Sequence, residues 1–225
     1  MDDHRNLTIR RTLDGSLTLY VPSLDEHYHS TGGAVRESEH IYINAALRAH
    51  PSSILNVLEV GFGTGLNALL TINSVVRHKR KANYVAVEPF ALPPDIVEQL
   101  HYAKYTDLPD PGDCIHKMHA AKPGIAVRLC KEFHFTMINR KIQDADLGER
   151  RFEVVFFDAF GPAADPEIWE DHVIRKVCLS MKPGGILTTF SVNGAVKRAL
   201  KKYGCEIETL PGPPGKRHML RAHKS

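Results

Sequence analysis

The hydrophobic positions of the chain fall into two kinds of pattern, one typical of buried strands and one typical of amphipathic helices. Short apolar or alternating runs predict strands over residues 54–60, 84–88, 133–138, 152–158 and 186–190. Longer runs predict helices over residues 66–76, 166–181 and 195–203, and a further helix that begins at Pro93-Pro94-Asp95. This alternation predicts an α/β fold with a mostly parallel sheet covered by helices on both faces.

Residues before the first buried strand carry a different pattern. Leu7–Arg10 and Ser16–Tyr20 are β-like and flank Asp14-Gly15, which is a strong hairpin signal. A helix is predicted over Val35–Ala49, where apolar side chains recur with helical spacing. The N-terminal part therefore predicts a small hairpin followed by one helix.

The end of the chain predicts a second hairpin. Residues 205–210 and 218–222 are β-like and flank a loop rich in proline and glycine, so we expect an antiparallel pair at the edge of the sheet. We expect two parts in all: an N-terminal hairpin and helix appendage, residues 1–50, and a core domain, residues 51–225.

The composition fits one globular protein. Of 225 residues, 43% are hydrophobic and 24% charged, which excludes a collagen-like or disordered class. The longest apolar run, Ile54–Leu70, is interrupted by polar residues and falls short of the roughly 20 residues that a membrane span needs. The start Met1–His4 lacks the basic flank and apolar stretch of a signal peptide. Four scattered cysteines fit reduced thiols, so we expect a cytoplasmic location.

Basic residues become more frequent toward the C-terminus, although the formal net charge is only +3. They are Lys197, Arg198, Lys201, Lys202, Lys216, Arg217, Arg221 and Lys224. A solvated helix face and a phosphate-binding surface both explain this distribution. The histidine pairs His27-x-His29 and His116-x-x-His119 lack third and fourth ligands at zinc-like spacing, so we expect no metal.

A glycine-rich loop follows the first buried strand, in the segment Glu59-Val60-Gly61-Phe62-Gly63-Thr64-Gly65. Glycines allow the backbone to turn sharply and leave room for a ligand, although a tight turn alone also explains them. The dinucleotide pattern would need a third glycine where Leu66 stands, which disfavours a nicotinamide enzyme. Glu59 could order the loop or meet the cationic amino-acid end of a cofactor. Glu88, at the end of the next strand, can accept hydrogen bonds from both ribose hydroxyls of an adenosine.

The order of strand, three-glycine loop, helix, strand ending in an acid and later strand ending in Asp158 resembles the class I (Rossmann-like) methyltransferase architecture. More narrowly, the chain resembles the MnmC-type tRNA methyltransferases over nearly its whole length. The segments that carry this resemblance are residues 25–30, 36–38, 59–67, 157–162, 166–169 and 215–219. The segment Phe157-Asp158-Ala159-Phe160-Gly161-Pro162 is the most telling of them.

This resemblance implies S-adenosylmethionine as the cofactor and tRNA as the partner. The implied reaction methylates the aminomethyl amine of the wobble uridine and gives 5-methylaminomethyl-(2-thio)uridine, after a separate enzyme has supplied the aminomethyl precursor. In two-domain members a flavin-dependent oxidase follows, whereas this sequence ends before one, so it resembles a stand-alone methylase. The lack of a long enough apolar run leads us to expect no membrane partner.

The candidate catalytic residue is Asp158, a carboxylate able to hold the ammonium form of the amine, accept its proton and aim its nitrogen; a loop cap is the structural alternative. The candidate cofactor-binding residues are Tyr28, Glu37, Glu59, Gly61, Phe62, Gly63, Thr64, Gly65, Asn67, Glu88 and Asp144. In much of the family a Gly-Asp pair contacts the adenine, but the matching residues 139–144 lack this pair. Asp144 is therefore the candidate that replaces it. The candidate substrate residues are Phe160, Pro162, Trp169, Lys216 and Arg217, of which Trp169 equally suits a core position and the last two ordinary surface charge.

Two other functions remain open at this point. An aminopropyltransferase similar to spermidine synthase, or another small-molecule amine methyltransferase, would also bind a sulfonium cofactor and an amine. A non-catalytic RNA-binding relative would retain the sheet without the reaction.

Overall fold

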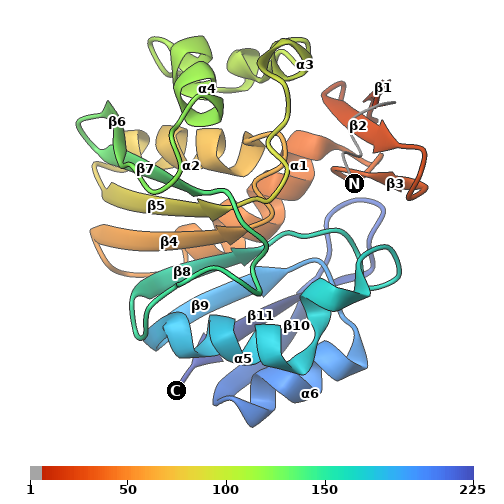
Figure 1. Ribbon diagram of the computed structural model, residues 1–225, viewed down its shortest axis with the longest axis vertical. Coiled ribbons are helices and arrows are strands. Elements are labelled where there is room, and N and C mark those ends of the chain that lie inside the picture. The colour runs from red at the N-terminus through yellow and green to blue at the C-terminus, as the bar shows by residue number, and fades with distance from the viewer. Residues whose placement is uncertain (1–6) are drawn as a thin grey trace.

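The computed structural model describes residues 7–225, so the start Met1–His4 lies outside the described residues. An eight-stranded sheet forms the core, in the order β10-β11-β9-β8-β4-β5-β7-β6 (Figure 1). Its strands are β4 (Ile54–Val60), β5 (Lys81–Val87), β6 (Val127–Cys130), β7 (Phe133–Ile138), β8 (Phe152–Phe157), β9 (Met181–Thr189), β10 (Cys205–Pro211) and β11 (His218–Lys224). The neighbours from β9 to β7 pair in parallel, which confirms the predicted α/β fold with a mostly parallel sheet.

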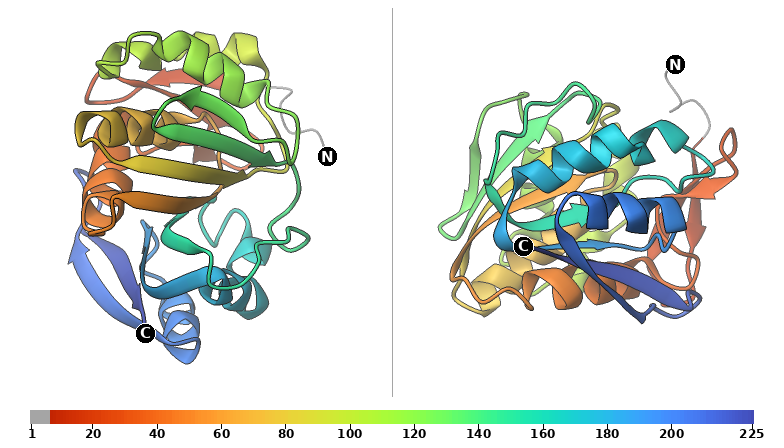
Figure 2. Two further views of the ribbon diagram at one scale, coloured as in Figure 1. Left: turned by 90° about the vertical axis from the view of Figure 1, so that its left-hand side faces the viewer. Right: turned by 90° about the horizontal axis from the view of Figure 1, so that it is seen from below.

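Helices cover both faces of this sheet, as the two views of Figure 2 show. One face carries α2 (Leu66–Arg77) and α4 (Pro111–His119), with the short α3 (Pro94–Glu98) and the 3-10 turn η2 (Tyr102–Tyr105) beside them. The other face carries η3 (Pro166–Trp169), α5 (Asp171–Ser180) and α6 (Gly194–Lys202). Successive strand residues point to opposite faces, so Val154 lies in the first core and Val155 in the second.

The N-terminal part is a three-stranded antiparallel sheet of β1 (Thr8–Arg11), β2 (Leu17–Val21) and β3 (Glu26–His27). The predicted hairpin is confirmed, because β1 and β2 pair across the Asp14-Gly15 turn.

The predicted helix over Val35–Ala49 is helical but changes type along its length. It consists of α1 (Ala34–Ser38) and a nine-residue π-helix, η1 (Glu39–Leu47), in which the Arg48 amide donates to the Ile43 carbonyl five residues earlier. Residues on η1 contact α2, β8 and β9, so this helix belongs to the layer that covers the core sheet. The division of the chain at residue 50 stays a prediction.

The two edges of the sheet show what the sequence pattern missed. The C-terminal hairpin is antiparallel as predicted, but its second strand, β11, pairs with β9 and leaves β10 at the edge. The opposite edge strand, β6, was not predicted, because it has only four residues, none of them fully buried, and a bulge between Arg128 and Cys130. Neither difference moves the carboxyl ends of the central parallel strands.

Candidate active site

A cavity of about 690 Å³ lies at the carboxyl ends of β4, β5 and β8. This volume is within the range of roughly 300–1,000 Å³ that is usual for small-molecule sites. Gly61, Glu88 and Asp158 each follow the last residue of a strand, and the backbone amides of Gly61 and Asp158 continue the strand pairing. The parallel register therefore brings residues far apart in sequence to one edge, where open α/β sheets bind ligands.

The glycine loop is tightly packed as well as tightly turned. Gly61, Gly63 and Gly65 have φ angles of +89°, +50° and +77°, which disfavour residues with a side chain. A Cβ at Gly61 would overlap the carbonyl oxygen of Asp158, and one at Gly63 would lie 2.9 Å from the Tyr28 ring. The expectation that these glycines make room for a ligand is thus incomplete, because protein atoms already occupy the space beside two of them.

The Glu88 carboxylate is held by backbone amides. Its Oε2 accepts from the amide of Gly63 at 3.0 Å and its Oε1 accepts from the amide of Phe90 at 2.9 Å. Burial raises the pKa of Glu88, and these donated hydrogen bonds counteract the rise. A carboxylate offers about four acceptor positions. The Glu88 carboxylate, which lines the cavity, therefore keeps acceptor capacity for hydroxyl groups of a ligand.

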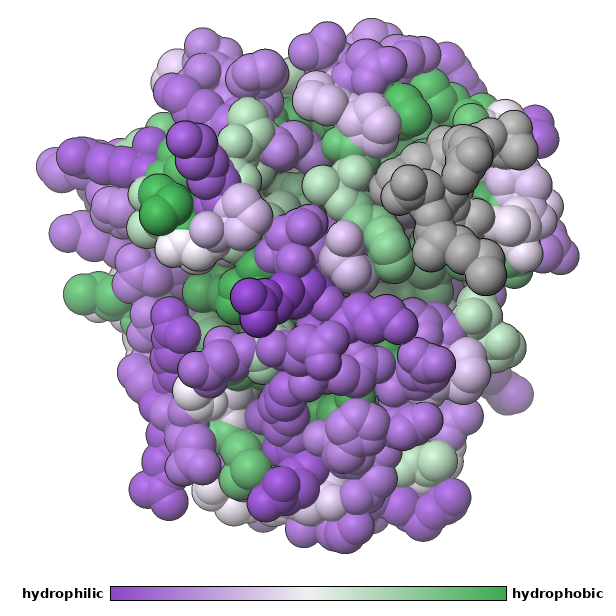
Figure 3. Space-filling view, in the orientation of Figure 1, coloured by the Kyte–Doolittle hydropathy of each residue, from purple (hydrophilic) through white to green (hydrophobic). Residues whose placement is uncertain are grey.

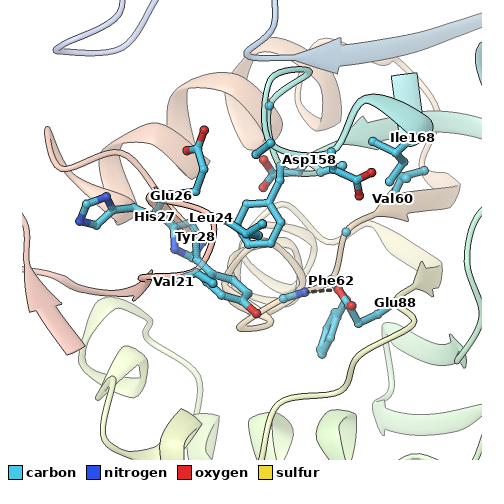
Figure 4. A pocket seen from close by; sticks show the side chains of 18 of the residues that line it. Val21, Leu24, Glu26, His27, Tyr28, Val60, Phe62, Glu88, Asp158 and Ile168 are labelled. Atoms are coloured by element: carbon cyan, nitrogen blue, oxygen red, sulfur yellow. Dashed lines mark hydrogen bonds between the residues drawn. The ribbon is translucent and has the colours of Figure 1, made fainter. Parts of the chain in front are cut away.

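Asp158 lies on the other side of the cavity from Glu88 (Figure 4). The Tyr42 hydroxyl donates to Asp158 Oδ1 at 2.6 Å, and Asn67 Nδ2 donates to Oδ2 at 2.7 Å. Burial, with a contribution from the charge of Glu37, raises the pKa of Asp158 to about 7, while the two hydrogen bonds and Lys216 oppose the rise. At neutral pH this carboxyl group is therefore divided between a form that accepts a proton and one that donates it.

Glu59 lies beneath the cavity and does not line it. Its side chain is fully buried, and Asn67 Nδ2 donates to Glu59 Oε1 at 2.9 Å as well as to Asp158. Burial raises the pKa of Glu59 well above its usual value, which favours the neutral form. Of the two roles expected for Glu59, the structure shows the ordering of the loop and its helix through Asn67.

Lys216 enters the cavity instead of the outer surface. Its Nζ lies 2.7 Å from Glu37 Oε1 and 4.0 Å from the centre of the Phe190 ring. Glu37 is 8% exposed and also accepts from the Ser30 amide at 2.6 Å. The neighbouring Arg217 is exposed. The two basic residues, which the sequence assigns to one RNA contact, thus occupy different environments.

The candidate site residues divide into those that line the cavity and those that do not. Tyr28, Phe62, Thr64 and Phe160 line the cavity with Glu37, Gly61, Gly63, Asn67, Glu88, Asp158 and Lys216. Glu59, Gly65, Asp144, Pro162, Trp169 and Arg217 do not line it.

Trp169 has the core position that the sequence left open as its alternative: its indole N–H donates to the Phe160 carbonyl at 2.7 Å and its ring packs on Phe157, so it supports the loop from behind. Asp144 is exposed, whereas Ile142 and Gln143 line the cavity, because the turn after β7 directs the earlier residues inward.

Tyr42 and Glu26 are two residues of this region that were not among the candidate site residues. Tyr42 fits an ordinary buried helical position, and Glu26 lies in the short strand β3 and lines the cavity, where Figure 4 shows it near the loop of Asp158. Glu26 lies in the segment 25–30 that carries the family resemblance, and this position could have indicated a role at the site. No local sequence pattern distinguishes Tyr42 from other buried helical residues.

Two further features concern residues 7–225, the described part of the chain. Within that range no group of three or more His, Cys, Asp or Glu side chains is arranged to hold a metal ion. The same residues contain no helix with the length and apolar character needed to cross a bilayer. On the face shown in Figure 3, hydrophobic residues form separate small patches among hydrophilic ones.

Fold and site together define the class I S-adenosylmethionine-dependent methyltransferase architecture, with a glycine loop after the first parallel strand and acids after its two neighbours. The chain belongs to the S-adenosyl-L-methionine-dependent methyltransferase family, whose model matches residues 97–225, more than half of the chain.

Curated relatives point to a narrower group. The chain is 27% identical to the tRNA 5-methylaminomethyl-2-thiouridine biosynthesis bifunctional protein MnmC of Cupriavidus metallidurans, over 91% of this chain and 32% of that protein. It is 28% identical to the MnmC of Magnetococcus marinus, again over 91% of this chain and 32% of the relative. The chain therefore spans about a third of the length of these relatives, and the predicted resemblance to MnmC-type methyltransferases is confirmed.

Solved structures show the same fold. MnmC2 from Aquifex aeolicus matches with a TM-score of 0.74 and 21% identity, over 97% of this chain and 70% of that one. Spermidine synthase from Thermotoga maritima matches with a TM-score of 0.62 and 12% identity, over 97% and 69%. At these identities the likeness concerns the fold alone.

Proposed function

We propose that this chain transfers the methyl group of S-adenosylmethionine to the aminomethyl amine of the wobble uridine in tRNA, giving 5-methylaminomethyl-(2-thio)uridine. The observation that carries the proposal is the Asp158 carboxylate, which faces the cavity across from Glu88 and has its pKa raised to about 7. The names of the MnmC relatives support the substrate. A cytoplasmic location and a separate enzyme for the aminomethyl precursor belong to the same proposal.

The lining residues fit the cofactor in three parts. We assign the ribose hydroxyls to the free acceptor positions of Glu88, and the adenine to the neighbourhood of Ile142 and Gln143 in place of Asp144. The Glu37–Lys216 ion pair offers one group of each charge to the amino and carboxyl groups of the methionine end. We assign the sulfonium to the part of the cavity next to Asp158, between the ribose and methionine ends.

The chemistry needs a neutral amine next to an activated methyl group. When bound, the cofactor supplies that methyl group on a positively charged sulfur. The Asp158 carboxylate can hold the substrate ammonium and take its proton, after which the nitrogen lone pair is free to form the new N–C bond while the S–C bond breaks. Because the donor is already activated, positioning of the amine and exclusion of water supply much of the remaining rate.

The proposal is tested by incubating the purified chain with labelled S-adenosylmethionine and tRNA from cells that lack the modification. We expect label in the wobble nucleoside, identified by mass spectrometry after digestion, and none with tRNA whose wobble uridine is unmodified. Calorimetric binding of the demethylated cofactor without any transfer to tRNA would contradict the substrate assignment.

One observation favours a second candidate, aminopropyl transfer to a polyamine. Acidic side chains that line the cavity outnumber the lysines: Glu26, Glu37, Glu88, Asp158, Asp165 and Glu167 against Lys141 and Lys216. Decarboxylated cofactor with putrescine provides the discriminating assay. Product formation there, and none with tRNA, would replace the first proposal by the second.

A further inference from the structure

Tyr42 connects the π-helix to the reactive end of the cavity. It lies in η1 with its ring 5.3 Å from that of Phe156, a residue of β8 two positions before Asp158. Tyr42 is 1% exposed and is flanked by the fully buried Ile41 and Ile43. π-Helical turns are rare and recur at functional sites. The core therefore fixes the Tyr42 ring, and the ring carries one polar atom to the site.

We infer that Tyr42 is a positioning residue, whose hydroxyl fixes the orientation and charge of the Asp158 carboxylate. The two carboxylate oxygens have separate donors from separate elements: Tyr42 on η1 for Oδ1 and Asn67 on α2 for Oδ2. Two such contacts prevent rotation of the carboxylate plane. Each carboxylate oxygen keeps a further acceptor position for a substrate group, since Asp158 lines the cavity.

The hydroxyl remains a donor at all relevant pH values. Burial, together with the charge of Asp158, raises the pKa of Tyr42 well above 10, so the phenol does not ionise in the working range. A donated hydrogen bond stabilises the carboxylate more than the carboxylic acid. Removing the Tyr42 hydroxyl therefore shifts Asp158 toward its protonated form.

Other charged groups face Asp158 and must stay constant in a test. Glu37 on α1 acts against the ionisation of Asp158, whereas Lys216 in the β10–β11 loop acts in its favour. Glu59 on β4 is joined to Asp158 through Asn67, and burial raises its pKa so that its neutral form is favoured. Below about pH 7 the carboxyl group of Asp158 is mainly protonated, so its ability to accept a proton falls with falling pH. A variant with a higher pKa loses this ability at a higher pH.

The test is the Tyr42→Phe variant, which keeps the ring and removes only the oxygen. Carboxyl carbon NMR of protein labelled at aspartate would follow the titration of Asp158, with the Asp158→Asn spectrum used for assignment. We expect the midpoint to rise by roughly one to two pH units, since hydrogen bonds to charged groups have about that effect. The low-pH limb of the methyl-transfer rate should move by the same amount, and this kinetic part rests on the proposed function.

Tyr102→Phe is the matched control. Tyr102 is also 1% exposed, and its hydroxyl donates to the Leu17 carbonyl at 2.9 Å, away from Asp158. We expect the Asp158 midpoint to stay unchanged in this variant. Asn67→Leu, which removes the donor to the other oxygen, provides an independent measurement and should also raise the midpoint.

The outcomes separate the two proposals. An unchanged Asp158 midpoint in Tyr42→Phe, or in Tyr42→Met if Tyr42→Phe does not fold, overturns the positioning role of Tyr42 whether or not the wild-type chain methylates tRNA. If the midpoint rises in Tyr42→Phe but the wild-type chain transfers no methyl group, the positioning role is supported and the proposed function is contradicted. A raised midpoint with a shifted rate profile supports both.

Discussion

The two ends of the cavity hold their carboxylates in different ways. Glu88 is bound by the backbone amides of Gly63, in the glycine loop after β4, and of Phe90, in the turn after β5. Asp158 is bound by the side chains of Tyr42 and Asn67, which come from two helices and lie 116 and 91 residues away in sequence. Backbone donors persist through most substitutions, whereas a side-chain donor is lost by a single one. The Asp158 end is therefore the more sensitive of the two.

The difference also separates two tasks in the proposed reaction. Binding of an adenosine requires a fixed shape, which a glycine loop of defined φ angles provides. Transfer to an amine requires a carboxyl group that changes protonation near neutral pH, which burial provides at Asp158. Substitutions at Asp158, Glu88, Gly63 and Arg217 test how the cavity divides these tasks.

Asp158→Asn should abolish most of the methyl transfer. The amide cannot take the proton of the amine, and positioned acids and bases contribute about 10²- to 10⁴-fold to rates. Single-turnover transfer of labelled methyl to tRNA measures the loss, and calorimetry with the demethylated cofactor should show nearly unchanged affinity. A rate within tenfold of the wild type would mean that Asp158 only caps its loop.

Glu88→Ala should weaken the cofactor without a comparable fall in the rate at saturating cofactor. Loss of a charged acceptor for two hydroxyls corresponds to about a 10- to 100-fold increase in Kd. Glu98→Ala is the control, because Glu98 is an exposed residue of α3 outside the cavity lining. Equal affinities of the two variants would place the ribose elsewhere.

Gly63→Ala should destabilise the fold more than Gly124→Ala. Both glycines have positive φ, +50° and +76°, and each variant should lose about 1–2 kcal/mol of unfolding free energy for that reason. Gly63→Ala has an additional cost, because its Cβ would lie 2.9 Å from the Tyr28 ring, whereas a Cβ at Gly124 meets nothing within 4 Å. Urea unfolding measures the difference, and an equal loss in both variants would show that Tyr28 moves freely.

Arg217→Ala should reduce tRNA affinity modestly and flatten its dependence on salt. Loss of one phosphate contact lowers the slope of log K against log salt by roughly 0.7–0.9. Lys216→Ala should leave this slope unchanged and alter turnover, since Lys216 pairs with Glu37 inside the cavity. The same slope change in both variants would return Lys216 to the RNA surface.

The local half of the site was predictable from the sequence. The glycine loop is contiguous, and its strand and helix bounds, Ile54–Val60 and Leu66–Arg77, agree closely with the predicted ones. Glu88 and Asp158 were predictable as a pair, because parallel strands place their carboxyl ends at one edge. Both features depend on regular backbone geometry, which periodicity reveals.

The other half depends on how irregular segments are folded back. Tyr42 reaches Asp158 only because η1 packs across β8, and Lys216 reaches Glu37 because the β10–β11 loop bends over the cavity. Asp144 lies outside the cavity lining, whereas Ile142 and Gln143 in the same turn line it, because no period fixes the side-chain direction there. The sequence contains the identity of such side chains, but no periodic pattern predicts which of them come into contact.

The position of β11 between β9 and β10 has a consequence for synthesis of the chain. Translation delivers β10 before β11, yet β10 pairs only with β11 in the finished sheet. Until β11 emerges, the outer side of β9 is an unpaired edge, a form of exposed strand that invites misassociation. β11 begins two residues after Lys216, so the pairing that covers the edge of β9 also brings Lys216 to the cavity lining.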